Sequence, residues 1–161
     1  MRNKHLRLMV PIILSFLLIT GCGGKKEAEK SEKVSFVASE SGGEVKIEAE
    51  KVATTAAGDW KGIPFYPGAK IVEKVSVSLP ASEEMENLEY RFLEVKDEVG
   101  RIAAFYQAEM PKRGWEGAFF SSENYAMGNY HKQDDKIIAV ITINKEKDKV
   151  SLMLATGTAR E

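Results

Sequence analysis

Alternating hydrophobic and polar residues predict a pair of strands in the middle of the chain. From Ala69 to Leu79 the apolar residues alternate with lysine and serine, with a break at Val72 and Glu73, and from Leu88 to Phe92 the same alternation recurs. Such alternation puts one set of side chains on each face of a strand. One face of the first strand is expected to carry Ile71, Val75, Val77 and Leu79. The short polar connection between the two runs indicates a hairpin.

A helical period replaces the alternation after Asp97. Between about Glu98 and Met110, apolar residues recur at spacings of three and four: Val99, Ile102, Ala103, Tyr106 and Met110. This spacing predicts a helix with one apolar stripe, and Asp97 is suited to cap its first turn. Pro111 and Gly114 are typical of a helix end, after which Trp115 is expected to fold back onto the stripe.

Four further strands are predicted after the helix. The runs are Trp115 to Ser121, Tyr125 to Lys132, Lys136 to Asn144 and Lys149 to Thr156. Their short polar separators favour antiparallel neighbours, because parallel pairs need long crossovers. We therefore predict an α+β fold in which an antiparallel sheet of about six strands carries one covering helix, in the order ββαββββ.

The segment before these elements is predicted to be a tether. Lysine, glutamate, serine and glycine dominate residues 22–58, a composition typical of solvated linkers. Apolar and polar residues alternate on both sides of Gly42-Gly43, which predicts a hairpin over residues 33–50, with an uninterrupted tether as the alternative. Thr54 to Gly58 is expected to be a flexible link. The compact domain is then residues 59–161.

The first 21 residues have the layout of an export signal. Basic residues Arg2, Lys4 and Arg7 precede an apolar run from Leu8 to Ile19. A helix over this run would be about 18 Å long, shorter than the roughly 30 Å hydrocarbon core of a bilayer. The run is therefore expected to direct export and not to remain as a membrane span.

The end of this segment resembles the bacterial lipoprotein signal. Ile19, Thr20 and Gly21 precede Cys22, which matches an aliphatic residue, two small residues and the invariant cysteine. The resemblance implies a diacylglyceryl group on the Cys22 thiol, cleavage before Cys22 and N-acylation of the new amino terminus. It also implies a lipid-anchored protein outside the cytoplasm. No other cofactor is expected.

The residue after the cysteine bears on sorting between membranes. Gly23 occupies the position where aspartate would resemble an inner-membrane retention signal. In a bacterium with two membranes we therefore expect the outer membrane, facing the periplasm. In a bacterium with one membrane, the protein would lie on the outer face of the cell membrane.

Composition narrows the function classes. The chain has 161 residues, of which 43% are hydrophobic and 29% charged, a globular balance. Without the signal, 20 basic residues face 24 acidic residues, a net charge of −4 that disfavours a nucleic-acid partner. Cys22 is the single cysteine, which excludes an intramolecular disulfide and a thiolate zinc cluster.

No residue set predicts catalysis or metal binding. His131 is the one histidine after the signal, and the acidic run Glu83 to Glu89 lacks the spacing of an EF-hand loop. Asp134-Asp135 is typical of a turn, and Ser121-Ser122 has no G-x-S-x-G setting. We predict a protein that is not an enzyme, with no catalytic residue and no metal site.

Three short motifs in the compact domain carry a second resemblance. Ile63 to Ala69, Phe105-Tyr106 and Gly114-Trp115 resemble a loose group of small bacterial lipoprotein domains of unknown function. This resemblance covers about 100 residues and implies no catalytic residue.

The leading functional hypothesis is a non-catalytic binding or interaction module of the cell envelope. Its partner would be an envelope protein or peptidoglycan, and its anchor would hold it on the membrane. Trp60, Phe65 and Tyr66 are candidates for contact with a partner, although such aromatics also close the end of a core. The alternative is a small-ligand carrier or sensor with an apolar pocket between sheet and helix, lined by Tyr90, Phe92, Tyr106 and Phe119.

Overall fold

The computed structural model describes residues 32–40, 43–80, 85–132 and 136–159. The signal segment, the residues around Cys22, Glu83-Glu84 and Asp134-Asp135 lie outside the described residues. The described part is mostly β: 67% of it is in strands, and it has one helix.

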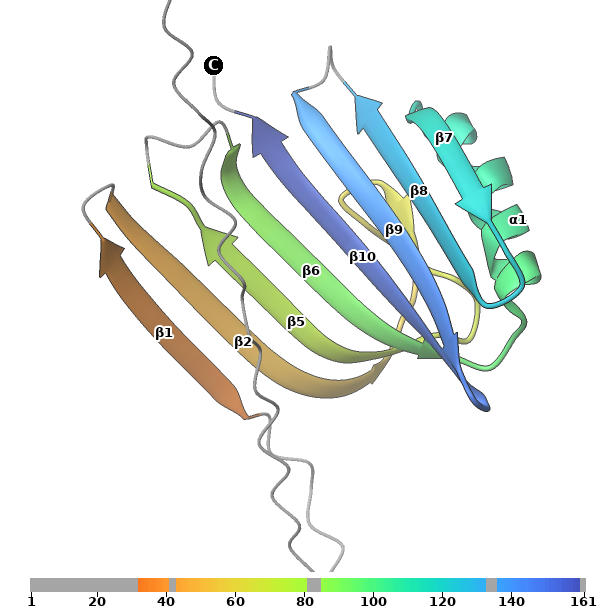
Figure 1. Ribbon diagram of the computed structural model, residues 1–161, viewed down its shortest axis with the longest axis horizontal. Coiled ribbons are helices and arrows are strands. Elements are labelled where there is room, and N and C mark those ends of the chain that lie inside the picture. The colour runs from red at the N-terminus through yellow and green to blue at the C-terminus, as the bar shows by residue number, and fades with distance from the viewer. Residues whose placement is uncertain (1–31, 41–42, 81–84, 133–135, 160–161) are drawn as a thin grey trace, which may run out of the picture.

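Eight antiparallel strands form one sheet in the order β1-β2-β5-β6-β10-β9-β8-β7 (Figure 1). The strands of this sheet are β1 (Lys33–Glu40), β2 (Gly43–Thr55), β5 (Lys70–Ser78), β6 (Met85–Val95), β7 (Glu116–Ser121), β8 (Tyr125–Lys132), β9 (Ile137–Glu146) and β10 (Lys149–Ala159). A two-stranded sheet pairs β3 (Asp59–Trp60) with β4 (Ile63–Pro64). The helix α1 (Val99–Lys112) follows β6.

The predicted fold class, an α+β fold with a six-stranded sheet in the order ββαββββ, is wrong. The hairpin β1–β2 belongs to the main sheet, because β2 pairs with β5 from Lys46 to Thr55. Residues expected to form a flexible link are part of this pairing, with Thr55 opposite Lys70. The pairing joins segments separated by the β3–β4 hairpin, and the local alternation on which the prediction was based cannot reveal such a partner.

Helix α1 begins and ends at local signals. The N-cap of α1 is Glu98 and not Asp97 as predicted, and no side chain makes a capping hydrogen bond there. The Asp97 Oδ1 instead accepts a hydrogen bond of 2.8 Å from the Glu98 N–H just before the first turn. Pro111 lies inside the last turn, and Gly114 then takes a left-handed conformation with φ of 73°. The Trp115 N–H donates to the Met110 carbonyl at 3.2 Å, which turns the chain back toward the helix.

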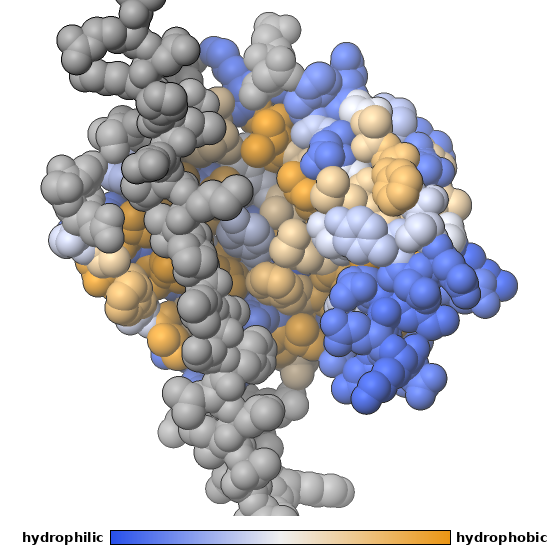
Figure 2. Space-filling view, viewed as in Figure 1, coloured by the Kyte–Doolittle hydropathy of each residue, from blue (hydrophilic) through white to orange (hydrophobic). Residues whose placement is uncertain are grey.

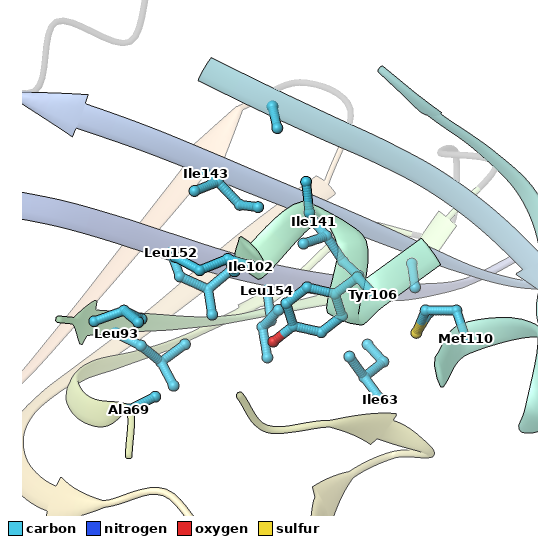
Figure 3. Packing of buried hydrophobic residues seen from close by; sticks show 14 of the residues in the cluster. Ile63, Ala69, Leu93, Ile102, Tyr106, Met110, Ile141, Ile143, Leu152 and Leu154 are labelled. Atoms are coloured by element: carbon cyan, nitrogen blue, oxygen red, sulfur yellow. The ribbon is translucent and has the colours of Figure 1, made fainter. Parts of the chain in front are cut away.

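The core lies between α1 and the sheet, and Figure 3 shows its packing. The helix contacts β4, β7, β8 and β9, so it covers one end of the sheet. Its apolar stripe is buried against residues such as Ile141 and Leu154, both 0% exposed. Trp115 is also buried, and its indole N–H donates to the Gly62 carbonyl at 2.9 Å, which fixes the β3–β4 hairpin beside the helix.

Candidate functional site

One face of the main sheet is not part of the core, and we call this side, opposite α1, the open face. Directly opposed residues of paired strands point to the same face. Leu93, Leu152 and Ile143 are opposed in the register and buried in the core. Alternation therefore places the residues between them, such as Phe92 and Met153, on the open face. Figure 2 views the molecule from this side and shows hydrophobic residues gathered on it.

Two rows of opposed residues cross six strands of the open face without a charged side chain. The first row contains Phe36, Ile47, Val77, Leu88, Gly157 and Ile138. The second row contains Val34, Ala49, Val75, Tyr90, Ala155 and Val140. We call these the two apolar rows. They bring together residues from both ends of the described chain.

Aromatic and sulfur-containing side chains extend the apolar surface beside the second row. Phe92 is opposite Met153, and its ring stacks on that of Tyr90 with centroids 6.4 Å apart and an interplanar angle of 17°. Farther along, Met127 is opposite Phe120, whose side chain is 64% exposed. Aromatic residues and methionine are enriched where proteins bind partners.

Charged residues of the open face lie toward its margins. Lys51 is opposite Glu73 where β2 meets β5. At the other side of the sheet, His131 is opposite Glu116, with 3.9 Å between Nε2 and Oε2. An apolar centre with polar groups around it is the usual composition of a binding surface.

The open face is closely packed where β6 meets β10. A Cβ atom at Gly157 would lie 2.4 Å from Met85 Cε and 2.7 Å from Leu88 Cδ2. The side chains of Met85 and Leu88 therefore lie directly on the backbone at Gly157. This part of the face is a continuous surface on which an apolar partner can lie.

The opposite side of the sheet is charged where α1 does not cover it. A shallow pocket of about 380 Å³ lies there, between β1, β2, β5 and β6. Its charged lining residues are Lys33, Glu48, Glu50, Lys74 and Arg91. Strands β2 and β5 are thus mainly apolar on the open face and carry most of the charged residues of this pocket on the side of the helix.

Arg91 belongs to this charged side and is held by its neighbours. Its guanidinium lies 4.5 Å from the Trp60 ring centroid and donates to the Tyr90 carbonyl at 2.8 Å. Burial lowers the pKa of Arg91, while the nearby Glu89 carboxylate opposes the change. The group stays protonated at neutral pH because an arginine pKa starts far above 7.

The four residues expected to line a pocket between sheet and helix are not brought together. Tyr90 and Phe92 lie on the open face. Tyr106 is buried in the core with 0% exposure, and Phe119 packs there against Tyr130, with ring centroids 6.4 Å apart. Two of the four thus lie on the face that we now consider the candidate site, and two are core residues.

The aromatic residues Trp60, Phe65 and Tyr66 pack against the core. The Trp60 ring lies beside Arg91 and is partly buried. Tyr66 packs edge-on against Phe105 with centroids 5.1 Å apart. Contacts within the chain therefore account for much of the surface of these three side chains.

Two of the residues considered for metal binding, Glu89 and His131, have charged partners in the chain. Glu89 pairs with Lys61 and lies 3.5 Å from Arg91, and His131 faces Glu116. Within the described ranges, no group of three or more histidine, cysteine, aspartate or glutamate side chains is placed to hold a metal ion. In the same ranges, no helix has the length and apolar character needed to cross a membrane.

The open face was missed because a β-bulge reverses the faces of β5. The alternation predicted that Ile71, Val75 and Val77 share one face. The register shifts between Ile71 and Glu73, so Ile71 is in the core while Val75 and Val77 lie on the open face. The break in alternation at Val72 and Glu73 was the available signal for this bulge.

Comparison with known proteins does not assign the chain to a family. No protein-family model, curated protein or solved structure matches the chain.

Proposed function

We propose that the protein is a lipid-anchored, non-catalytic binding protein of the bacterial cell envelope, and that the open face is its binding surface. The observation that supports this most strongly is the pair of apolar rows, which cross six strands without a charged side chain. The lipoprotein signal ending at Cys22 supports the anchor and the compartment.

Physical chemistry favours a partner with an apolar surface. Each square ångström of apolar surface removed from water contributes about 25 cal/mol, so covering a sheet face is favourable. Few groups on the two apolar rows can donate or accept hydrogen bonds, because the rows hold one hydroxyl, that of Tyr90, and otherwise hydrocarbon side chains. We therefore expect an envelope protein that docks an apolar patch there.

A small-ligand carrier is the second candidate, and the same face favours it. An acyl chain needs no hydrogen bond, and methionine and phenylalanine at Met127, Met153 and Phe92 adapt to such chains. The space between sheet and helix suits a ligand less well, since Ile102, Tyr106 and other core residues fill it.

A photo-crosslinking residue at Val75 tests the proposal, with Ser76 as its matched control. The two positions are adjacent, and they point to opposite faces of β5. In membranes of the native host, we expect a discrete protein adduct from Val75 and none from Ser76. If Val75 gave only adducts of lipid mass, the result would reject docking of an envelope protein and support the small-ligand carrier. Equal labelling at both positions, or no adduct at Val75, would reject the open face as the site.

Mass spectrometry of the same preparation tests the anchor separately. We expect Cys22 at the amino terminus of the wild-type protein, carrying diacylglyceryl and N-acyl groups. In the Cys22→Ala protein we expect neither the lipid groups nor the cleaved amino terminus. An unmodified Cys22 in the wild-type protein would reject the lipid anchor, whatever the crosslinks show.

A further inference from the structure

Strand β1 is an edge of the main sheet and carries unusual apolar exposure. It is the first strand in the sheet order, so one of its sides has no neighbouring strand among the described residues. Three of the five large hydrophobic side chains exposed in the described residues belong to it: Val34 (59%), Phe36 (59%) and Val37 (50%). An exposed apolar edge is a template for pairing with another chain.

The usual protection of an edge strand is weak in β1. The strand pairs with β2 over eight consecutive positions without a register shift, so no bulge bends it. It contains no proline, and between its terminal residues Lys33 and Glu40 it has no charged residue. Natural edges are commonly protected by each of these features, so their absence indicates an edge that is covered.

The register identifies which backbone groups of β1 point outward. The Lys51 N–H donates to the Glu32 carbonyl at 3.1 Å, so Glu32 faces β2. Residues that face the neighbour alternate along an antiparallel strand. The outward N–H and C=O groups are therefore those of Lys33, Ser35, Val37 and Ser39.

We propose that a second copy of this chain pairs with β1 in antiparallel orientation, with Phe36 on the two-fold axis. This register opposes Ser35 to Val37 of the second copy, and Lys33 to Ser39 of the second copy. In this register, each of the four residues with outward backbone groups is opposed to a β1 residue of the second copy. A register centred on Ser35 would leave Ser39 without an opposed strand residue, and one centred on Val37 would do the same to Lys33.

The side chains of β1 suit this register. Phe36 would oppose Phe36 of the second copy in a non-hydrogen-bonded pair, where the Cα atoms are only about 4.5 Å apart. On the same face, Val34 would oppose Ala38 of the second copy. Aromatic cross-strand pairs stabilise antiparallel strands, so the most exposed apolar residues of the edge become buried against each other.

A second copy is favoured over an unrelated peptide because the strand complements itself. Its apolar side chains lie symmetrically about Phe36, with Val34 on one side and Ala38 on the other. The axis is perpendicular to the sheet, so both open faces lie on the same side, and the first apolar row continues from one copy into the other. Pairing of β1 does not require that the open face binds anything, and it is tested independently of the proposed function.

Cysteine crosslinking in native-host membranes tests the register. With copper phenanthroline as the oxidant, Phe36→Cys is expected to form a disulfide-linked dimer, because the opposed Cα distance suits a disulfide. Ser35→Cys is the matched control, since Ser35 would oppose Val37 and not itself. The wild-type protein, whose single cysteine is Cys22, is the control for disulfides formed through Cys22. A dimer from Phe36→Cys alone supports the proposal, and equal dimer in both variants or none from Phe36→Cys overturns it.

A backbone variant tests the hydrogen bonds without disturbing the fold. Val37→Pro removes an outward N–H and none that pairs with β2, while Val37→Thr keeps it. By sedimentation of the purified full chain in detergent, we expect a concentration-dependent dimer for wild type and Val37→Thr. We expect at least tenfold weaker dimerisation for Val37→Pro with an unchanged circular dichroism spectrum. A monomeric wild type, or a Val37→Pro protein that dimerises equally, would overturn the proposal.

Discussion

The Tyr66 hydroxyl donates a hydrogen bond of 2.7 Å to the Asp97 carboxylate. This bond connects the segment between β4 and β5 to the turn before α1, and the edge-on contact of Tyr66 with Phe105 of the helix lies beside it. The Glu98 N–H and the Arg101 guanidinium, 3.6 Å away, also face the carboxylate. The hydrogen bond thus holds the segment between β4 and β5 against the start of α1.

The Tyr66 hydroxyl is expected to make the stability of the protein fall at alkaline pH. Burial, and then the hydrogen bond to Asp97, raise the pKa of Tyr66 to about 12 from an ordinary value of 10.0. The unfolded chain then loses this proton at lower pH than the folded protein, so the stabilising contribution is complete below pH 10 and falls between pH 10 and about 12. In urea titrations at several pH values, Tyr66→Phe should lose less stability over this window than wild type. Parallel curves for the two proteins would contradict the assignment.

The second prediction concerns acid pH. The hydrogen bond from Tyr66, and then that from the Glu98 N–H, hold the pKa of Asp97 below its ordinary value of 3.8. A lowered carboxyl pKa stabilises the fold above the unfolded pKa, and the contribution is lost as the pH falls through the folded pKa. In Tyr66→Phe we expect the Asp97 pKa to move upward, measured by carboxyl carbon chemical shifts. A downward or absent shift would show that the Tyr66 hydroxyl does not act on Asp97.

Local patterns were enough to predict this region of the chain. The three- and four-residue spacing of apolar residues predicted the helix and its buried stripe. The residues that share one side of a helix are set by their spacing in the sequence, whatever the helix packs against. Pro67-Gly68 is a dipeptide typical of turns, and Gly68 has a positive φ of 77°. The bond between Tyr66 and Asp97 was not predictable, since it joins segments 31 residues apart.

The third prediction concerns the Tyr106 hydroxyl in the core. Within the described residues no group makes a geometrically good hydrogen bond to this buried oxygen. Burial raises the pKa of the phenol far above its ordinary value, and the nearby Tyr66 backbone only partly opposes this change. Removing an unsatisfied buried hydroxyl relieves a desolvation cost, so Tyr106→Phe should raise the free energy of unfolding by about 1 kcal/mol or leave it unchanged. Chemical denaturation measures this. Tyr106→Ala should lower it by about 3–5 kcal/mol, because the ring fills the core.

The open face shows the limit of the local patterns. Its two apolar rows exist because β2 pairs with β5 and β6 pairs with β10, and strand partners depend on tertiary packing that alternation does not contain. The bulge near Val72 then inverts the faces of one strand. A shift of one residue exchanges core and open face, so one unrecognised bulge was enough to hide the surface.

The fourth prediction concerns the glycine beneath the Phe119 ring. A Cβ atom at Gly128 would lie 2.3 Å from Phe119 Cδ2 and 2.7 Å from Tyr130 Cε2, so the ring of Phe119 packs directly on the backbone of β8. Gly128→Ala should lower the free energy of unfolding by about 1–3 kcal/mol, because the ring must leave its position. Thermal and chemical denaturation measure this loss.

Gly100 provides the matched control for that substitution. It lies in α1, it is exposed, and a Cβ atom there would meet no atom within 4 Å. Gly100→Ala should therefore stabilise the protein by about 0.5–1 kcal/mol, since alanine favours the helix and restricts the unfolded chain. In Gly128→Ala combined with Phe119→Leu, we expect part of the lost stability to return, because the smaller side chain can move away from the new methyl group. If the two losses simply add, Phe119 does not cause the clash.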